Sequence, residues 1–82
     1  MAILAKRVRM RGCVQFEVGQ EQVIAELNNE GIWCCKYSTI ASLLNTLYGE
    51  ESRRLNDPAA LQALLARVAR TLHGQVIPPG QS

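Results

Sequence analysis

Basic side chains near the amino terminus are the feature of this sequence with the clearest chemical meaning. The first eleven residues contain no acidic residue and hold four cations: Lys6, Arg7, Arg9 and Arg11. A cluster of this kind produces a local positive potential that attracts phosphates or acidic surfaces. The same charges also suit a solvated edge strand, where they oppose strand-to-strand aggregation. Both interpretations stay open at this point.

Residues for catalysis are sparse. The only histidine, His73, follows a run of helical period, where the negative end of the helix dipole accounts for it without catalysis. Neither a pair of carboxylates nor a set of serine, histidine and aspartate has a recognisable context. We therefore expect a protein that is not an enzyme and that uses no cofactor.

The cysteines do not follow a metal-binding pattern. Cys34 and Cys35 are adjacent and lack the two-residue spacer with which a cysteine pair binds zinc, and Cys13 is remote in sequence. We expect no metal site and interpret the cysteines as buried free thiols that pack as small apolar groups. An odd number of cysteines is typical of a reduced intracellular compartment, so we expect a cytoplasmic protein.

The length and composition of the chain favour a small domain that associates with itself. The chain has 82 residues, of which 48% are hydrophobic, and its formal net charge is +2. A chain of this size buries only about 60–65% of the surface that its unfolded form exposes. Burial against a second copy is the simplest remedy, so we expect a homodimer. No apolar run approaches the roughly 18 residues of a membrane span, so we expect no membrane partner.

Alternating residues predict a β-hairpin at the amino terminus. Residues 3–11 place arginines and apolar side chains on opposite faces, and residues 14–18 alternate in the same way. Gly12 separates the two runs and predicts an antiparallel link between them. Residues 32–37 are rich in strand formers and suit either a third short strand or a buried connector.

Three helices are expected after the hairpin. Residues 20–29 show the apolar spacing of a first helix, and residues 38–48 show that of a second helix, which ends at Gly49. Asp57 followed by Pro58 predicts the start of a third helix, which runs to about residue 73.

These elements together predict an α+β fold. In it, an amino-terminal β-hairpin, with or without a third short strand, packs against three helices. Residues 1–74 are expected to form a single compact domain, since no internal repeat is evident. Residues 75–82 contain two prolines and a glycine and are expected to form a flexible carboxy-terminal tail.

The run EQVIAELNNEGI followed by KYSTIASLLNTLYG resembles the helix-turn-helix segment of winged-helix regulators and of serine-recombinase carboxy-terminal domains. The residues that carry the resemblance are Ile24, Ala25, Leu27, Asn28, Gly31, Ile32, Ser38, Thr39 and Ile40. The resemblance implies that the helix over residues 38–48 enters the major groove. Its polar residues would then contact bases and phosphates.

The order strand, helix, glycine, helix over residues 14–49 also resembles a ribbon-helix-helix regulator. In that family, paired strands of a dimer enter the major groove. The resemblance implies that Gln15 and Glu17 read bases. The two resemblances agree on a small DNA-binding protein but place different elements on the duplex.

The sequence therefore favours a small dimeric DNA-binding regulator or accessory factor of phage or plasmid type. Phosphate contacts are expected from the cations Lys6, Arg7, Arg9, Arg11 and Lys36. Groove contacts are expected from Thr39, Ser42 and Asn45, and contacts to the flanking backbone from Arg53 and Arg54.

The alternative is a small non-enzymatic inhibitor or adaptor of phage or mobile-element type, which blocks a partner protein's surface. A third hypothesis is a structural subunit whose last helix pairs with a partner helix. The arrangement of the cations discriminates between the first two. Convergence on one face favours DNA, whereas pairing with nearby glutamates favours the protein-binding module.

Overall fold

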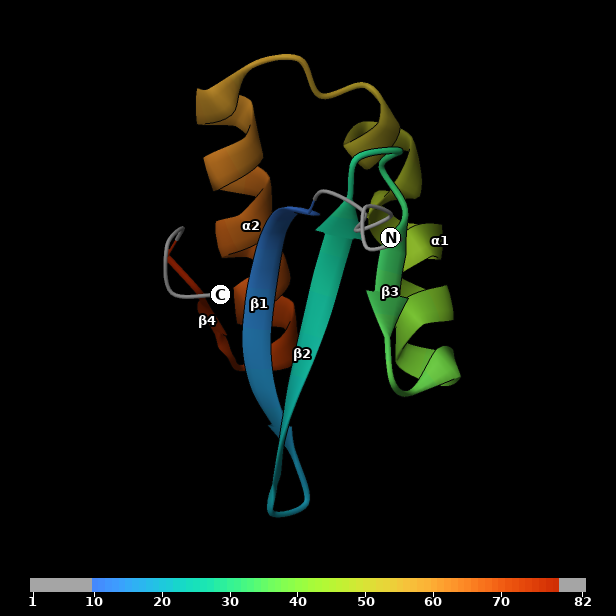
Figure 1. Cartoon of the computed structure of the whole chain (residues 1–82), viewed down its shortest axis with the longest axis vertical. Helices are drawn as coiled ribbons and strands as arrows, with labels where there is room; N and C mark the ends of the chain where they lie inside the picture. The colour runs from blue at the N-terminus through green and yellow to red at the C-terminus, as the bar shows by residue number, and fades with distance from the viewer. Residues whose placement is uncertain (1–9, 79–82) are drawn as a thin grey trace, which may run out of the picture.

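The computed structural model describes residues 10–78 as a four-stranded antiparallel sheet with two helices packed on one of its faces (Figure 1). The elements are β1 (Met10–Val18), β2 (Glu21–Asn28), β3 (Trp33–Cys35), α1 (Ser38–Arg53), α2 (Pro58–Leu72) and β4 (Gln75–Val76). The strand order is β3-β2-β1-β4, so the last strand pairs with the first. The predicted α+β class is confirmed.

The prediction of a helix over residues 20–29 is wrong, because this segment forms β2. β2 pairs antiparallel with β1 along its whole length. Val23, Ala25 and Leu27 alternate toward the helices and are buried, while Ile24 points to the opposite face and is 44% exposed. The spacing of Val23, Ile24 and Leu27 fits a helix as well as a strand, so the apolar pattern was ambiguous here.

The hairpin turn lies at Gly19 instead of the predicted Gly12. Gly19 has φ +65°, a left-handed conformation that glycine adopts without steric cost. Gly12 lies inside β1, next to a register shift typical of a β-bulge. A Cβ atom at Gly12 would stand 2.6 Å from Cδ1 of Leu65, so the missing side chain lets α2 approach the strand. Most of the predicted strand over residues 3–11 lies outside the described residues.

The second predicted helix corresponds to α1, but it does not end at Gly49. The helix continues to Arg53, and Gly49 is buried within it. The residue before the helix is Tyr37, whose carbonyl oxygen accepts the first helical hydrogen bonds, and no side chain caps this end. Residues 32–37 contain β3, so the option of a third short strand is the correct one.

The third predicted helix corresponds to α2, which begins at Pro58 as expected. It ends at Leu72 and is capped by His73, whose φ of 56° is left-handed. A Cβ atom at Gly74 would stand 2.1 Å from the carbonyl oxygen of Gln15, so glycine is required where the chain turns back to the sheet. Residues 75 and 76, which the sequence places in a tail, form β4 beside β1.

A single apolar core lies between the sheet and the helices. The sheet contributes Val14, Phe16, Val23, Ala25, Leu27 and Trp33, and the helices contribute Leu44, Leu64, Leu65, Val68 and Ala69. Two polar contacts also join the helices: the hydroxyls of Tyr48 and Thr71 share a hydrogen bond of 2.7 Å, and Arg67 forms an ion pair with Glu51. The opposite face of the sheet is not covered by either helix (Figure 1).

Candidate functional site

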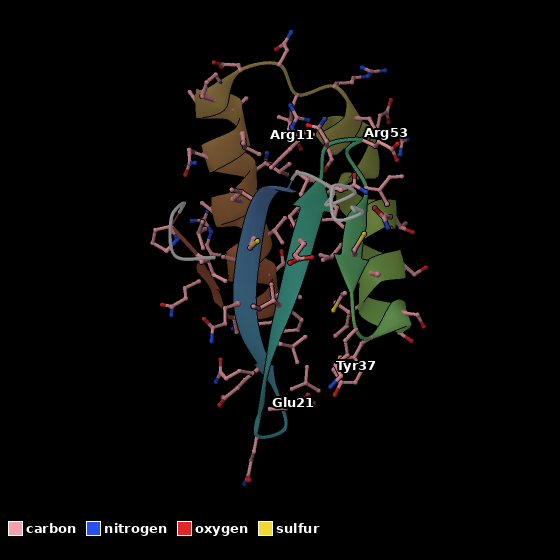
Figure 2. The ribbon with its side chains drawn as sticks, in the orientation of Figure 1. Arg11, Glu21, Tyr37 and Arg53 are labelled. Carbon is pink, nitrogen blue, oxygen red and sulfur yellow. The ribbon has the colours of Figure 1, made fainter. Side chains whose placement is uncertain are left out.

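The cations predicted to contact phosphates are spread over the molecule. Three of them lie outside the described residues: Lys6, Arg7 and Arg9. Arg11 and Arg53 lie toward the same end of the long axis (Figure 2). The guanidinium of Arg11 donates a hydrogen bond of 3.1 Å to the carbonyl oxygen of Leu55, so it also ties β1 to the connection between the helices.

Two further predicted cations are paired with carboxylates. Lys36 forms an ion pair with Glu21, and Arg54 forms one of 3.0 Å with Glu50, one turn earlier in α1. Both pairs are exposed, and exposed pairs contribute little to stability. They place a carboxylate beside each of these two cations, so neither Lys36 nor Arg54 is an unopposed charge.

Lys36 belongs to a polar cluster that ties the β1–β2 hairpin to the start of α1. The Tyr37 hydroxyl donates a hydrogen bond of 2.7 Å to Glu21, and the Lys36 ammonium lies 5.7 Å from the centroid of the Tyr37 ring. The hydrogen bond from Lys36, followed by that from Tyr37, lowers the pKa of the Glu21 carboxyl. The hydrogen bond to Glu21 also raises the pKa of Lys36 and that of Tyr37. Glu21 and Tyr37 lie toward the end opposite Arg11 (Figure 2).

Of the residues predicted to face a DNA groove, only Thr39 and Ser42 are exposed on α1. Asn45 points toward the sheet instead. Its side-chain oxygen accepts a hydrogen bond of 2.8 Å from the backbone N–H of Trp33, and its side-chain NH₂ donates one of 3.0 Å to the Trp33 carbonyl. Asn45 therefore serves the fold by covering the outer edge of β3.

The outward face of α1, which we call the α1 surface, consists of Thr39, Ser42, Leu43, Thr46 and Leu47. Leu43 and Leu47, one turn apart, are 46% and 56% exposed. The sequence from Ser38 to Tyr48 contains no charged residue, so this part of the helix is neutral.

Two open depressions adjoin the α1 surface. One, of about 580 Å³, is lined by Ser38, Thr39, Ser42, Leu43 and Thr46. The other, also of about 580 Å³, extends from Leu47 past Glu50 and Arg54 to Leu55 and Ala60 on the inter-helix connection and α2. The α1 surface thus presents raised leucines beside hollows.

The open face of the sheet holds another depression, which we call the sheet groove. Its volume is about 470 Å³, and it is lined by Glu21, Gln22, Val23, Ile24, Glu26, Cys34, Cys35 and Lys36. Ile24 supplies exposed apolar surface on β2, and Glu26 lies two residues further along the strand. Among residues 10–78, no cation lies within ion-pair distance of Glu26. The groove therefore combines an aliphatic side chain with an excess of carboxylate.

The strand register places Cys13, Glu26 and Cys34 in one row across β1, β2 and β3. Cys13 is only 6% exposed, and this burial, followed by the negative charge of Glu26, raises the pKa of its thiol. Cys34 is exposed. Within the described residues, no group of three histidine, cysteine, aspartate or glutamate side chains is placed to hold a metal ion.

The strand residues that would read bases in a ribbon-helix-helix protein bond to one another. Gln15 donates a hydrogen bond of 2.7 Å to Gln22, which donates one of 3.1 Å to Glu17. His73 lines an open polar depression of about 250 Å³ with these side chains. The sequence pattern did not indicate this polar network, because the pairing that creates it depends on β2 being a strand.

Comparisons with known proteins found no match among protein-family models, curated proteins or solved structures. Both resemblances to DNA-binding regulators require a helix over residues 20–29, where the structure has β2. Across the described part of the chain, neither helix has the length and apolar composition needed to cross a bilayer. The sheet groove, the α1 surface and the positions of the charges are the features of the described residues that bear on function.

Proposed function

We propose that this chain is a small non-enzymatic protein-binding module, an inhibitor or adaptor that acts by occupying a partner protein's surface. The observation that carries the proposal is the sheet groove, where Ile24 is exposed beside the carboxylate of Glu26. An exposed aliphatic side chain within a depression offers a partner apolar area to bury. The partner that suits this groove is a protein segment that presents basic and aliphatic side chains together.

The charge of the groove supports a basic partner. Glu21 and Glu26 line it together with one cation, Lys36, and that cation is already paired with Glu21. A guanidinium or ammonium from a partner would meet Glu26 without displacing an existing ion pair among the described residues. Hydrogen bonds to a charged group contribute about 1.5–3 kcal/mol, with the lower end expected at a partly solvated site.

The positions of the cations favour this function over DNA binding. Lys36 and Arg54 are paired with carboxylates, and Asn45 is bonded to the backbone of Trp33. A phosphate backbone would have to compete with Glu21 and Glu50 for the two cations. A DNA-binding face gains most of its affinity from unopposed cations, which release counterions from the duplex.

The test is a titration of the isotope-labelled protein, followed by two-dimensional NMR, with a peptide of alternating arginine and valine. We expect the amide signals of β2 and β3 to shift, and we expect Glu26→Gln to weaken binding by about tenfold, equivalent to roughly 1.4 kcal/mol. The matched control is Glu30→Gln, in the exposed turn after β2, which should leave the affinity unchanged. An equal loss in both variants would show general charge attraction and would contradict the sheet groove as the site.

A second candidate, binding to double-stranded DNA, is favoured by one observation. Arg11 and Arg53 lie toward the same end of the molecule (Figure 2), and the sequence carries Lys6, Arg7 and Arg9 just before Arg11. Fluorescence anisotropy of a labelled random duplex at several salt concentrations tests it. Affinity that falls steeply with salt would favour this candidate and give the number of phosphates contacted. No binding at low salt would remove it.

A further inference from the structure

We propose that two copies of this chain associate through the α1 surface, with the two α1 helices antiparallel around a two-fold axis. The proposal assigns an interface and is independent of what binds in the sheet groove. Leu43 and Leu47 are the two most exposed large aliphatic side chains in the described part of the chain, and they lie one turn apart on one helix. Their outward direction follows from the opposite side of α1, where Asn45 bonds to the backbone of Trp33 and Ser52 is fully buried.

The neutrality of the α1 surface is what makes a second copy the suitable occupant. In a two-fold interface the same patch appears on both sides, so any net charge on the patch lies opposite the same charge on the other copy and is repelled by it. Residues 38–48 carry no charge and avoid this repulsion. The sheet groove fails the same criterion, because Glu26 of each copy would approach the carboxylate of the other.

The shape of the α1 surface also matches itself. The two-fold axis is placed at the level along α1 that lies midway between residues 44 and 45. Antiparallel pairing then sets Leu47 of one copy opposite Ser42 of the other, and Leu43 opposite Thr46. Ser42, Leu43 and Thr46 line the depression at the start of the helix, so a leucine from the second copy enters a hollow. This is the ridge-into-groove packing of antiparallel helix pairs.

Charge is complementary at the ends of the proposed pair. The same pairing sets Glu50 of one copy opposite Thr39 of the other, within the first turn of the partner's α1. That turn contains no acidic residue of its own, so the positive end of its helix dipole has no carboxylate from its own helix. Glu50 is exposed and forms its ion pair with Arg54 of the same helix, so both groups are accessible to the second copy.

The test is sedimentation velocity of the full chain over a range of concentrations. We expect a dimer whose fraction rises with concentration, and we expect Leu43→Lys to be monomeric with unchanged circular dichroism, because it sets two cations near the axis. The control is Ile24→Lys on the open sheet face, which should leave the dimer intact. A monomer at every concentration of the native chain, or a dimeric Leu43→Lys variant, would overturn the proposal.

A mixing experiment separates a lost interface from a damaged fold. In the proposed register, position 43 of one copy faces position 46 of the other. Leu43→Lys and Thr46→Glu are therefore each expected to be monomeric alone and to form a heterodimer when mixed. Two variants that were simply misfolded would not restore one another, so failure of the mixture to associate would overturn the register.

Discussion

The side chain of Asn45 hydrogen-bonds both the N–H and the carbonyl of Trp33, so that one amide on α1 replaces a neighbouring strand at the edge of the sheet. β3 is an edge strand of three residues, and unpaired edges invite association with other strands. The amide of Asn45 has the donor and the acceptor that such a strand would have supplied. Asn45, which the sequence predicts to contact DNA, therefore has a structural role at the edge of the sheet.

Asn45→Ala should destabilise the fold and expose this edge. The substitution leaves the N–H and the carbonyl of Trp33 without their partners, at a cost of about 1–3 kcal/mol for the pair. Urea unfolding followed by tryptophan fluorescence measures the change in the free energy of unfolding. The control is Gln62→Ala, an exposed residue of α2 outside the α1 surface, which should change that free energy by no more than about 0.5 kcal/mol. Equal effects would mean that the bonds to Trp33 are not what stabilises the edge.

The second prediction concerns Ser52, the one buried polar residue of the described chain. Its hydroxyl accepts a hydrogen bond of 3.0 Å from the indole N–H of Trp33. Ser52→Ala would leave that buried donor without an acceptor, which costs about 1–3 kcal/mol. Chemical unfolding of Ser52→Ala beside Ser42→Ala, an exposed serine of the same helix, measures this cost. A Ser42→Ala variant as unstable as Ser52→Ala would show that the loss reflects helix propensity and not the bond to Trp33.

The sequence predicts some elements of this fold and not others, because some patterns fit a single structure and others fit two. The class, the start of α2 at Pro58 and the buried positions Val14 and Phe16 of β1 follow from patterns within a few residues. The strand structure of β2 does not follow from such patterns, because its apolar spacing fits the period of a helix as well as that of a strand. Only its pairing with β1 selects the strand.

The same limit applies to the candidate site. Glu21 with Lys36, and Asn45 with Trp33, are contacts between residues more than ten positions apart. Charge and residue type therefore marked Lys36 and Asn45 as available for a ligand, and only the folded chain reveals their partners. The exposed Thr39 and Ser42 were located correctly on a helix because that helix has a single clear apolar stripe.

The third prediction concerns the dependence of stability on pH through Glu21. The pKa of its carboxyl is lowered in the folded chain, mainly by Lys36 and then by Tyr37. A group whose pKa is lower when folded stabilises the fold above its unfolded pKa, near about 4.3, and this contribution is lost as pH falls through the folded pKa. The native chain should therefore melt at a higher temperature than Glu21→Gln at neutral pH, and the two melting temperatures should converge in acid. The control Glu30→Gln, whose carboxyl has no ion pair among the described residues, should not show this convergence.

The last prediction concerns the reactivity of the thiols on the open face of the sheet. Cys34 is exposed, whereas Cys13 is buried and its pKa is raised by that burial and by Glu26. The thiolate is the nucleophile, so burial and the raised pKa both slow the reaction of Cys13, whereas Cys34 is accessible. Brief treatment with iodoacetamide followed by peptide mass spectrometry should label Cys34 first and label Cys13 only after urea is added. Glu26→Gln removes the nearby negative charge and should speed labelling of Cys13 only slightly, because burial is the larger cause. Rapid labelling of Cys13 in the native chain would contradict the burial of β1 at this position.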